Sequence, residues 1–270
     1  CLKHLQGADA GMVLVDNNSN DRTVEQVKKR FKEVKIIENK KNEGFARGNN
    51  IGMKTAKGDK ILLLNSDCFA EPDALKKIYK LDKDAVGCKL LNKDGSVQQS
   101  WGYFPTLRRI TQMMLFIDNL PIIRKFIDSI HVRDVSRYNH EREVDWVTGA
   151  FVMLKREVFE KVGGIDEKYF MYGEEMEWMY RIKKAGYKVW YSPAASATHL
   201  MGASSANRAP AVVGEMKGWI YWFSKHNPVW EQKVLPWVIL LGCVLRIVLK
   251  LNLYGFYRQA TSEIFGRTRK

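Results

Sequence analysis

The sequence predicts an α/β fold in which a mostly parallel sheet is flanked by helices. Three observations support this prediction: short apolar runs alternate with helical patterns, polar residues follow each apolar run, and 46% of the 270 residues are hydrophobic. A chain of this length and composition can bury a large core. Strands joined through helices run parallel, so their carboxyl ends are expected to line one crevice.

The predicted elements of the first half follow one another without a break. Apolar runs typical of strands occupy residues 11–16, 34–39, 60–65 and 84–91. Stretches typical of helices lie between them, at residues 20–31, 44–58 and 71–79. Pro72 stands near the start of the third predicted helix, where a missing N–H removes no helical hydrogen bond.

The alternation is interrupted between residues 101 and 143, where apolar and basic residues are mixed. A variable insertion, an amphipathic helical hairpin and a lipid-facing patch all fit this composition. The strand and helix pattern returns at 144–164, where the predicted helix ends in two glycines. The stretch 165–193 then adds a helix with an acidic start and a basic end, which the helix dipole favours, and another strand.

The C-terminal region, 206–270, is predicted to be helical and basic. Its apolar run from Val234 to Leu245 is shorter than the roughly twenty residues that a membrane-spanning helix needs. Arg246 and Lys250 are four residues apart and share a helix face. Both an interfacial helix on an anionic membrane and a helix packed on the protein fit this pattern.

The net charge of +14 and the isoelectric point near 9.5 imply an anionic partner, either nucleic acid, an anionic membrane or a phosphate-rich substrate. The basic residues are dispersed and form no known nucleic-acid-binding motif, so we expect no nucleic acid. The four cysteines have no CxxC spacing, which argues against zinc or disulfides and favours a reducing compartment. Neither GxGxxG nor a Walker A loop occurs, so phosphates must be bound in another way.

Three groups of polar residues are candidates for such a site. Asp67 follows shortly after the apolar run 61–64. At this position it is either a turn residue or a ligand for Mg²⁺, because Mg²⁺ binds few protein carboxylates and takes phosphate oxygens as further ligands. Glu175 lies at an acidic helix start and points away from Glu177, which has Arg181 as a surface partner four residues later. His199 follows a predicted strand. Each residue alone has an ordinary structural explanation, and the combination favours a site.

The chain resembles the family 2 glycosyltransferases of the GT-A fold, which is Rossmann-like, and in particular their bacterial rhamnosyltransferase-like members. The matching segments fall in the expected order over roughly residues 11 to 205. They are VDNNSNDRTVE, NEGFARGNNIG, ILLLNSD, EPDAL, VTGAFVMLKREVFEKVGGIDEKYFMYGEE and THLMGAS. The resemblance therefore implies a GT-A domain over residues 1–205, followed by the helical extension 206–270 with a proposed membrane association.

The resemblance also implies a role for each matching residue. The nucleotide would lie against Asp16, Asn18, Asn49 and Ser66. Asp67 and His199 would bind Mg²⁺ or Mn²⁺ at the diphosphate, and Glu175 would be the catalytic base. The transferred sugar and the acceptor would lie near Gly149, Ala150 and Glu174.

The implied activity is inverting transfer of a sugar from a nucleotide-diphosphate sugar, such as dTDP-rhamnose or a UDP-sugar. The acceptor would be a hydroxyl of a glycan or lipid-linked molecule in cell-surface polysaccharide synthesis. Such an enzyme would be cytoplasmic and peripheral to the inner face of the cell membrane. Two alternatives are a catalytically idle GT-A module that acts as a membrane-associated scaffold and, less favoured, a basic nucleic-acid-binding protein.

The sequence departs from the family pattern at three places. Asn65 stands where a DxD motif has its first Asp, and Glu175 stands where Asp is commoner. The family's first strand, which lies in the middle of the sheet, would precede Cys1. Without that strand we expect its neighbours to have unpaired backbone edges and the chain to have low activity or stability.

Overall fold

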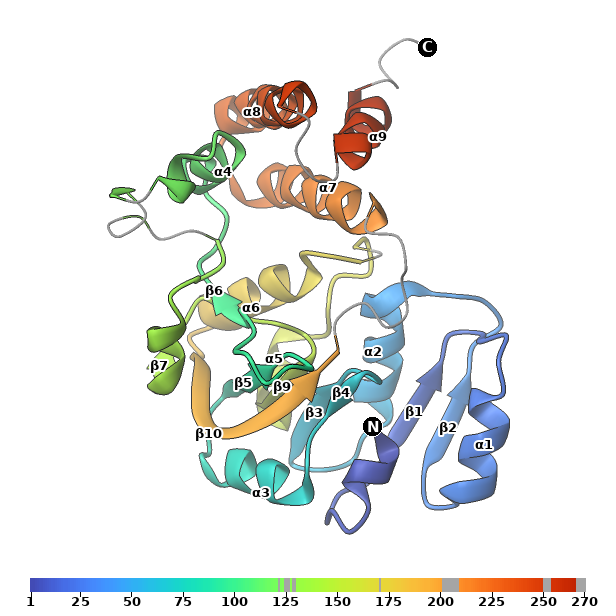
Figure 1. The fold of residues 1–270 in the computed structure, drawn as a ribbon. Helices are drawn as coiled ribbons and strands as arrows, with labels where there is room; N and C mark the ends of the chain where they lie inside the picture. The colour runs from blue at the N-terminus through green and yellow to red at the C-terminus, as the bar shows by residue number, and fades with distance from the viewer. Residues whose placement is uncertain are drawn as a thin grey trace. The chain divides into compact units, whose positions relative to one another are not determined.

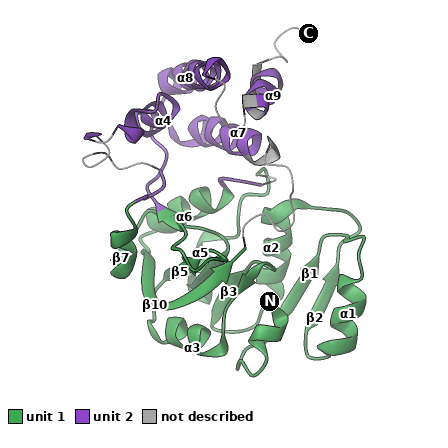
Figure 2. Ribbon diagram, in the orientation of Figure 1, with its two compact units in different colours: residues 1–101, 134–170, 174–201 green, residues 102–133, 171–173, 202–270 purple. Residues whose placement is uncertain are grey.

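A computed structural model describes residues 1–120, 122–123, 127, 130–169, 171–200, 209–249 and 254–265. The chain divides into two compact units, drawn in different colours in Figure 2. Unit 1 comprises residues 1–101, 134–170 and 174–201, and unit 2 comprises 102–133, 171–173 and 202–270. The segment predicted as an insertion at 101–143 is therefore divided, since residues 102–133 group with the C-terminal helices.

Unit 1 begins with a parallel pair of strands (Figure 1). After the 3₁₀ turn Leu2–Leu5, strand β1 (Val13–Asp16) pairs with β2 (Lys35–Glu38), and helix α1 (Thr23–Arg30) connects them. Helix α2 (Gly44–Thr55) follows and packs against β1 and, less extensively, against β3. This is the strand–helix alternation that the sequence predicts for residues 11–58.

The larger sheet of unit 1 is mixed rather than mostly parallel, which corrects the predicted strand directions. Its order is β3–β9–β5–β10–β4, and β7 pairs with β10 outside that path. Only β5 and β10 run parallel, whereas β3 with β9, β5 with β9 and β10 with β4 and β7 are antiparallel. The strands are β3 (Lys60–Leu64), β4 (Cys68–Phe69), β5 (Ala85–Leu91), β7 (Arg142–Glu143), β9 (Phe151–Lys155) and β10 (Val189–His199).

Strand β9 lies between β3 and β5 and runs antiparallel to both. It follows a short strand, β8 (Trp146–Val147), that is not part of the larger sheet. β8 forms a separate two-stranded sheet with β6 (Trp101–Gly102). In the described part of the chain, β1 pairs only with β2, and β3 pairs only with β9, so each has one edge without a strand partner.

Helices flank the larger sheet, which confirms the α/β fold class. Helix α3 (Pro72–Lys80) packs on β10, α5 (Arg156–Val162) packs on β9, and α6 (Glu174–Lys184) packs on β8 and β10. A 3₁₀ turn, Val135–Asn139, precedes β7. The main core cluster contains side chains from α3 and four strands of the sheet, and includes Cys68, Ala74, Ile78, Val86, Cys88, Leu90, Phe151, Met153 and Ala197.

Unit 2 is helical, as the sequence predicts for its C-terminal part. Its helices are α4 (Leu107–Met114), α7 (Ala209–His226), α8 (Val229–Val248) and α9 (Tyr254–Phe265), with a 3₁₀ turn at Ile117–Asn119. Helix α8 packs against α4, and α7 and α8 both pack against α9. No helix in the described ranges is long and apolar enough to cross a bilayer.

Arg246 is buried inside unit 2, which for this residue favours the second of the two alternatives, a helix packed on the protein. Its guanidinium donates hydrogen bonds to the backbone oxygens of Met114 at 2.6 Å and Met113 at 2.9 Å and lies over the Phe116 ring. These bonds satisfy carbonyl groups at the C-terminal end of α4, where a cation is favoured. Lys250 lies outside the described residues.

Candidate active site

Asp67 is held by a tight turn at the end of β3. Alternate side chains of β3 are buried, and the chain leaves the core at Asn65. The Asn65 backbone N–H donates to Ala150 O at 3.0 Å, and the Cys68 N–H donates back to Asn65 O at 3.0 Å. Ser66 is therefore exposed at the tip of the turn, whereas the Asp67 side chain retains 20% exposure. The turn places one carboxylate between the core and solvent.

The pairing of β10 with β4 brings His199 to Asp67. His199 lies opposite Cys68 in the antiparallel register, and the next N–H, that of Leu200, donates to Asp67 O at 3.0 Å. His199 Nε2 consequently lies 3.3 Å from Asp67 Oδ1. The polar contact with His199 is the main cause that holds the pKa of the Asp67 carboxyl below its usual value. The two residues that the sequence assigns to a metal are thus adjacent.

Gln98 orients His199 and was not found from the sequence, in which no motif surrounds it. Its buried side-chain NH₂ donates to Asn92 Oδ1 at 3.0 Å and to His199 O at 3.2 Å. The remaining Gln98 oxygen lies 2.7 Å from His199 Nδ1, so Nδ1 carries the proton. His199 Nε2 is then the atom that faces Asp67. Only the folded chain shows this bond, because Gln98 and His199 are 101 positions apart.

The Asp67–His199 pair fits a divalent cation. With Nδ1 protonated, a bare Nε2 lone pair would face a carboxylate oxygen at 3.3 Å, and two acceptors repel unless a proton or a metal lies between them. Within the described residues, no group of three or more His, Cys, Asp or Glu residues could hold a metal. One carboxylate and one imidazole leave positions for diphosphate oxygens and water, and the imidazole favours Mn²⁺ over Mg²⁺.

The acidic start of α6 contains three carboxylates with different environments. Glu177 is fully buried and accepts a 2.8 Å hydrogen bond from Arg181 Nε, which corrects the expected surface pair. Arg181 also donates to the backbone oxygens of Val162 and Gly164. Glu177 and Arg181 therefore attach α6 to the end of α5, and their role is structural.

Glu174 and Glu175 form the second candidate centre. Glu174 is 4% exposed, and burial, followed by the charge of Glu175, raises the pKa of Glu174 well above its usual value. Glu175 is half-buried and lies beside Gly149. A Cβ on Gly149 would lie 2.9 Å from Phe45 Cζ and 3.8 Å from Glu175 Cβ, so only glycine fits there without a shift. Burial therefore disfavours the charged form of Glu174, and Glu175 is the more accessible carboxylate of the two.

Residues 149–150 connect the two centres. A Cβ added to Gly149 would lie 3.8 Å from Glu175 Cβ, and the next residue, Ala150, accepts the hydrogen bond from Asn65 that begins the Asp67 turn. Both residues are buried. The structure therefore brings together Asp67, His199, Glu174, Glu175, Gly149 and Ala150, all of which were selected from the sequence.

The residues assigned to the nucleotide lie on the loops after β1 and in α2. Asp16 is buried, and its Oδ2 accepts a hydrogen bond from Ser19 N at 3.1 Å, which shapes the loop after β1. Asn18 is exposed in this loop with a left-handed φ of 62°. Asn49 Nδ2 donates to Phe45 O within its own helix at 2.9 Å. Their roles toward a nucleotide stay predictions.

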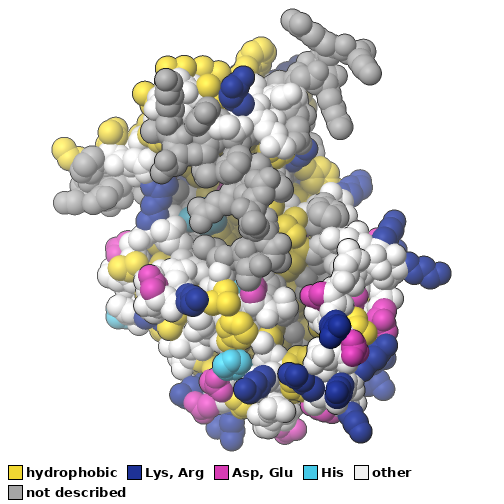
Figure 3. All heavy atoms as spheres, turned by 45° about the vertical axis from the view of Figure 1, so that its right-hand side comes forward, with side chains coloured by type: hydrophobic (Ala, Val, Ile, Leu, Met, Phe, Trp, Pro, Cys, Tyr) yellow, Lys and Arg dark blue, Asp and Glu magenta, His cyan; other side chains and the backbone are white. Residues whose placement is uncertain are grey.

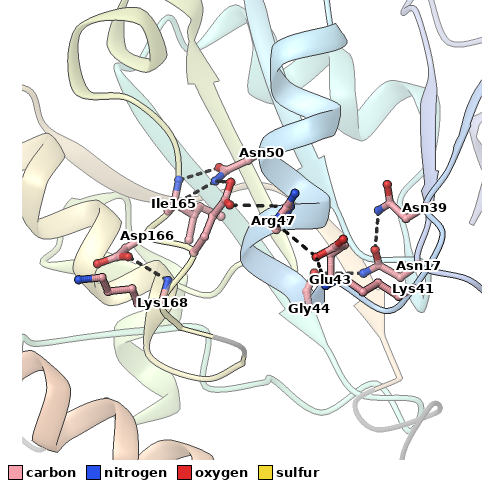
Figure 4. Close-up of polar contacts among 11 residues, drawn as sticks. Asn17, Asn39, Lys41, Glu43, Gly44, Arg47, Asn50, Ile165, Asp166 and Lys168 are labelled. Atoms are coloured by element: carbon pink, nitrogen blue, oxygen red, sulfur yellow. Dashed lines mark hydrogen bonds and ion pairs between the residues drawn. The ribbon is translucent and has the colours of Figure 1, made fainter.

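Two asparagines that the sequence did not single out make the longer-range connections (Figure 4). Asn17 Nδ2 donates to Gly44 O at 3.0 Å, and Asn17 Oδ1 accepts from Asn39 Nδ2 at 2.8 Å, so Asn17 joins the loops that follow β1 and β2 to α2. Asn50 exchanges two 2.8 Å hydrogen bonds with the backbone of Ile165. In the sequence each lies beside another Asn, and nothing in either pair indicates which side chain faces inward.

A family model described as glycosyl transferase family 2 matches residues 1–163. The chain belongs to glycosyl transferase family 2. A second model, described as the N-terminal domain of galactosyltransferase, matches residues 131–201 of this glycosyltransferase and so spans Glu175 and His199. The family that the sequence motifs indicated is therefore confirmed.

The curated relatives of this glycosyltransferase include two rhamnosyltransferases. The N-acetylglucosaminyl-diphospho-decaprenol L-rhamnosyltransferase of Mycobacterium tuberculosis is 25% identical over 276 residues, which cover 95% of this chain and 89% of the relative. The rhamnosyltransferase WbbL of Escherichia coli K12 is 30% identical over 170 residues, which cover 58% of this chain and 60% of the relative.

Solved structures confirm the GT-A-like fold. GalNAc-T7 with UDP, GalNAc and Mn²⁺ gives a TM-score of 0.57 at 19% identity, covering 79% of this glycosyltransferase and 42% of that chain. The mannosyltransferase PcManGT from Pyrobaculum calidifontis, in complex with GDP-Man and Mn²⁺, gives 0.52 at 16% identity, covering 97% of this chain and 78% of that one.

Proposed function

We propose that this glycosyltransferase is an inverting enzyme that moves a sugar from a nucleotide-diphosphate sugar to a hydroxyl of a glycan or lipid-linked acceptor. The observation that carries this proposal is the pair of centres on either side of residues 149–150: Asp67 with His199, and Glu174 with Glu175. One centre has the chemistry to bind a diphosphate, and the other has a carboxylate that can accept a proton. A transferase of this class needs both.

The relatives support rhamnose as the sugar and a lipid-linked acceptor. Two are named rhamnosyltransferases, and the name of the mycobacterial relative includes a diphospho-decaprenol. The match to that relative covers 95% of this chain. We accordingly propose a role in cell-surface polysaccharide synthesis, with dTDP-rhamnose as the first donor to test and UDP-sugars as the next. The nucleotide would lie against Asp16, Asn18 and Asn49, with Ser66 near the ribose or a phosphate.

Glu175 is the proposed catalytic base. A hydroxyl is a weak nucleophile, and its attack on the anomeric carbon is faster when a carboxylate accepts the proton. Burial raises the pKa of Glu174 well above its usual value, whereas Glu175 is only half-buried and lies beside Gly149, so Glu175 is the carboxylate of the two that we assign as proton acceptor. Attack from the side opposite the leaving group inverts the anomeric configuration. The departing group is the nucleoside diphosphate.

Asp67 and His199 are the proposed ligands for Mn²⁺ or Mg²⁺. When bound, such a cation offsets the negative charge that develops on the departing diphosphate. Two structures with the same fold were solved with Mn²⁺ together with UDP or GDP-mannose, which supports this part of the proposal. Gln98 keeps the Nδ1 atom of His199 protonated, and so keeps Nε2 directed at the cation.

Thermal melting with a panel of nucleotide sugars tests the proposal. The expected result is a rise in melting temperature with one donor only when Mn²⁺ is present, since ligand at about 100 times its Kd adds roughly 2.7 kcal/mol of stability. The matched nucleoside monophosphate is the control, because it lacks the diphosphate that the cation binds. No rise with any donor would overturn the proposal, and donor binding without turnover would favour the idle scaffold module.

A further inference from the structure

Helix α8 has an exposed apolar stripe along its whole length. Most of the large apolar side chains that are exposed in the described part of the chain belong to this helix or its C-cap. Six of them follow one another at spacings of three and four residues, which places them on one narrow helix face. We call these six the α8 stripe: Trp230, Val234, Trp237, Leu241, Val244 and Val248.

The stripe is strongly exposed because the opposite face of α8 is fixed inside unit 2. Trp230, Trp237 and Val248 have 59%, 68% and 70% of their surface accessible. The opposite face contains Ile239 and Cys243, both fully buried. Arg246 on that side is bonded to the α4 carbonyls, and a Cβ added at Gly242 would lie 2.5 Å from Met114 Cε. Rotation of α8 to hide the stripe would break this packing.

A contiguous exposed apolar face of this kind marks an interaction site. The charge of unit 2, which contains the stripe, indicates what the stripe binds. The sequence of unit 2 contains fifteen Lys and Arg residues against five Asp and Glu residues, whereas unit 1 contains twenty-nine against twenty-five. On the face drawn in Figure 3, Lys and Arg side chains are intermixed with Asp and Glu in the lower part of the view. Lys233 is exposed beside the stripe, and Lys225 is exposed near the end of α7.

We propose that the α8 stripe docks this enzyme on the anionic leaflet at the inner face of the cell membrane. The stripe supplies the apolar face, and the cationic unit 2 supplies the attraction to anionic lipid, which are the two components of interfacial helix binding. Two tryptophans on the stripe suit the headgroup region. The helix lies on the membrane, since no helix in the described ranges is apolar enough to cross it.

A lipid surface fits the stripe better than a second copy of this chain. Two copies that met through α8 would bring two strongly cationic units together, and like charges at an interface oppose association. An anionic leaflet has the complementary charge. The docking inference goes beyond the proposed function, because it depends on no residue of the donor or acceptor site.

Co-sedimentation of the full chain with vesicles tests the inference. We expect binding to vesicles with one third phosphatidylglycerol, little binding to pure phosphatidylcholine, and weaker binding as salt rises. The double variant Trp237→Ser/Leu241→Ser is expected to lower the partition coefficient at least about tenfold, because it removes two apolar anchors. Val135→Ser, which changes an equally exposed apolar residue in unit 1, is the matched control and should bind like the wild type.

The melting temperature and the response to donor separate a failure of docking from a failure of the proposed function. Both variants should melt at the wild-type temperature and keep any Mn²⁺-dependent response to donor, so a failure of docking is distinguishable from a failure of the proposed function. Unchanged vesicle binding by the double variant would overturn the inference. A double variant that loses only self-association in sedimentation velocity would assign the stripe to a second copy instead, and would equally overturn it.

Discussion

Asp67 and His199 meet because of strand register. Asp67 directly precedes β4, His199 ends β10, and these two strands pair with His199 opposite Cys68. A shift by one position would turn His199 to the other side of the sheet. The identity of both residues could be predicted from motifs, but their 3.3 Å separation depends on an antiparallel pairing that the sequence analysis did not predict.

The role of Gln98 can be tested by its replacement with a side chain of similar length. Gln98→Met removes the oxygen that accepts from His199 Nδ1, and we expect Mn²⁺ affinity to fall about 10–100-fold, which is typical when such a supporting bond is lost. The readout is the Mn²⁺ concentration that gives half of the donor-dependent melting shift. Gln98→Glu should restore much of the affinity, because it keeps an acceptor, and the exposed neighbour variant Gln99→Met should have no effect.

Glu174 gives a pH-dependent prediction. Its folded-state pKa is raised above the ordinary 4.5, so the unfolded chain loses this proton first and stability is lost as pH rises above 4.5. Glu174→Gln removes this loss. We expect the variant to be more stable than the wild type at pH 7 and equal to it at pH 4. The difference in the free energy of unfolding at pH 7 is about 1.4 kcal/mol for each pKa unit between the folded and the unfolded state.

Urea unfolding at the two pH values measures this difference. Glu157→Gln, at an exposed position in the first turn of α5, is the control and should differ from the wild type by less than about 0.5 kcal/mol at both pH values. A Glu174→Gln variant that is less stable than the wild type at pH 7 would mean that the Glu174 carboxyl is ionised and stabilising in the folded protein.

At the scale of the elements, helix α2 packs on β1 and is also bonded to the segment before α6. Asn50 makes the bonds to that segment. Its buried amide bonds to both backbone groups of Ile165 and to Glu167 Oε1 at 3.0 Å. Asn50→Ala leaves these groups unsatisfied and is expected to lower the free energy of unfolding by about 1–3 kcal/mol. Asn49→Ala removes only a bond within α2 and should change it by less than about 0.5 kcal/mol.

Urea unfolding of the two neighbouring variants checks this prediction, and donor binding separates their roles further. Asn49→Ala should weaken the donor-dependent melting shift if Asn49 contacts the nucleotide as the family pattern implies. Equal stabilities for both variants would show that the bonds from Asn50 to Ile165 contribute nothing measurable.

Apart from the two-residue strand β4, the order of strands and helices up to β5 could be predicted because each has a local signal: an apolar run, a glycine, a proline or a charge gradient. The direction of β9 could not be, since its local pattern is that of any buried strand and its neighbours in the sheet, β3 and β5, precede it by many residues. The burial of Arg246 escaped prediction for the same reason, because its partners lie on α4.

At the scale of the whole molecule, the chain comprises an α/β unit with nearly balanced charge and a helical unit that is strongly cationic. The C-terminal charge excess and the apolar run were visible in the sequence. Which face of α8 is exposed was not, because α8 is apolar on both faces and only its packing against the other helices of unit 2 decides between them. The same cationic character that draws unit 2 to anionic lipid would also favour phosphate-bearing substrates.

The central claim is that Asp67 binds the donor diphosphate through a cation and that Glu175 acts as the base. Donor binding and sugar transfer, measured on the same Glu175→Gln and Asp67→Asn proteins with Mn²⁺, test it most directly, with the exposed Asp73→Asn as the control. We predict that Glu175→Gln keeps donor binding but loses transfer by a factor of about 10²–10⁴, whereas Asp67→Asn loses both. Transfer at the wild-type rate by either variant would contradict the claim.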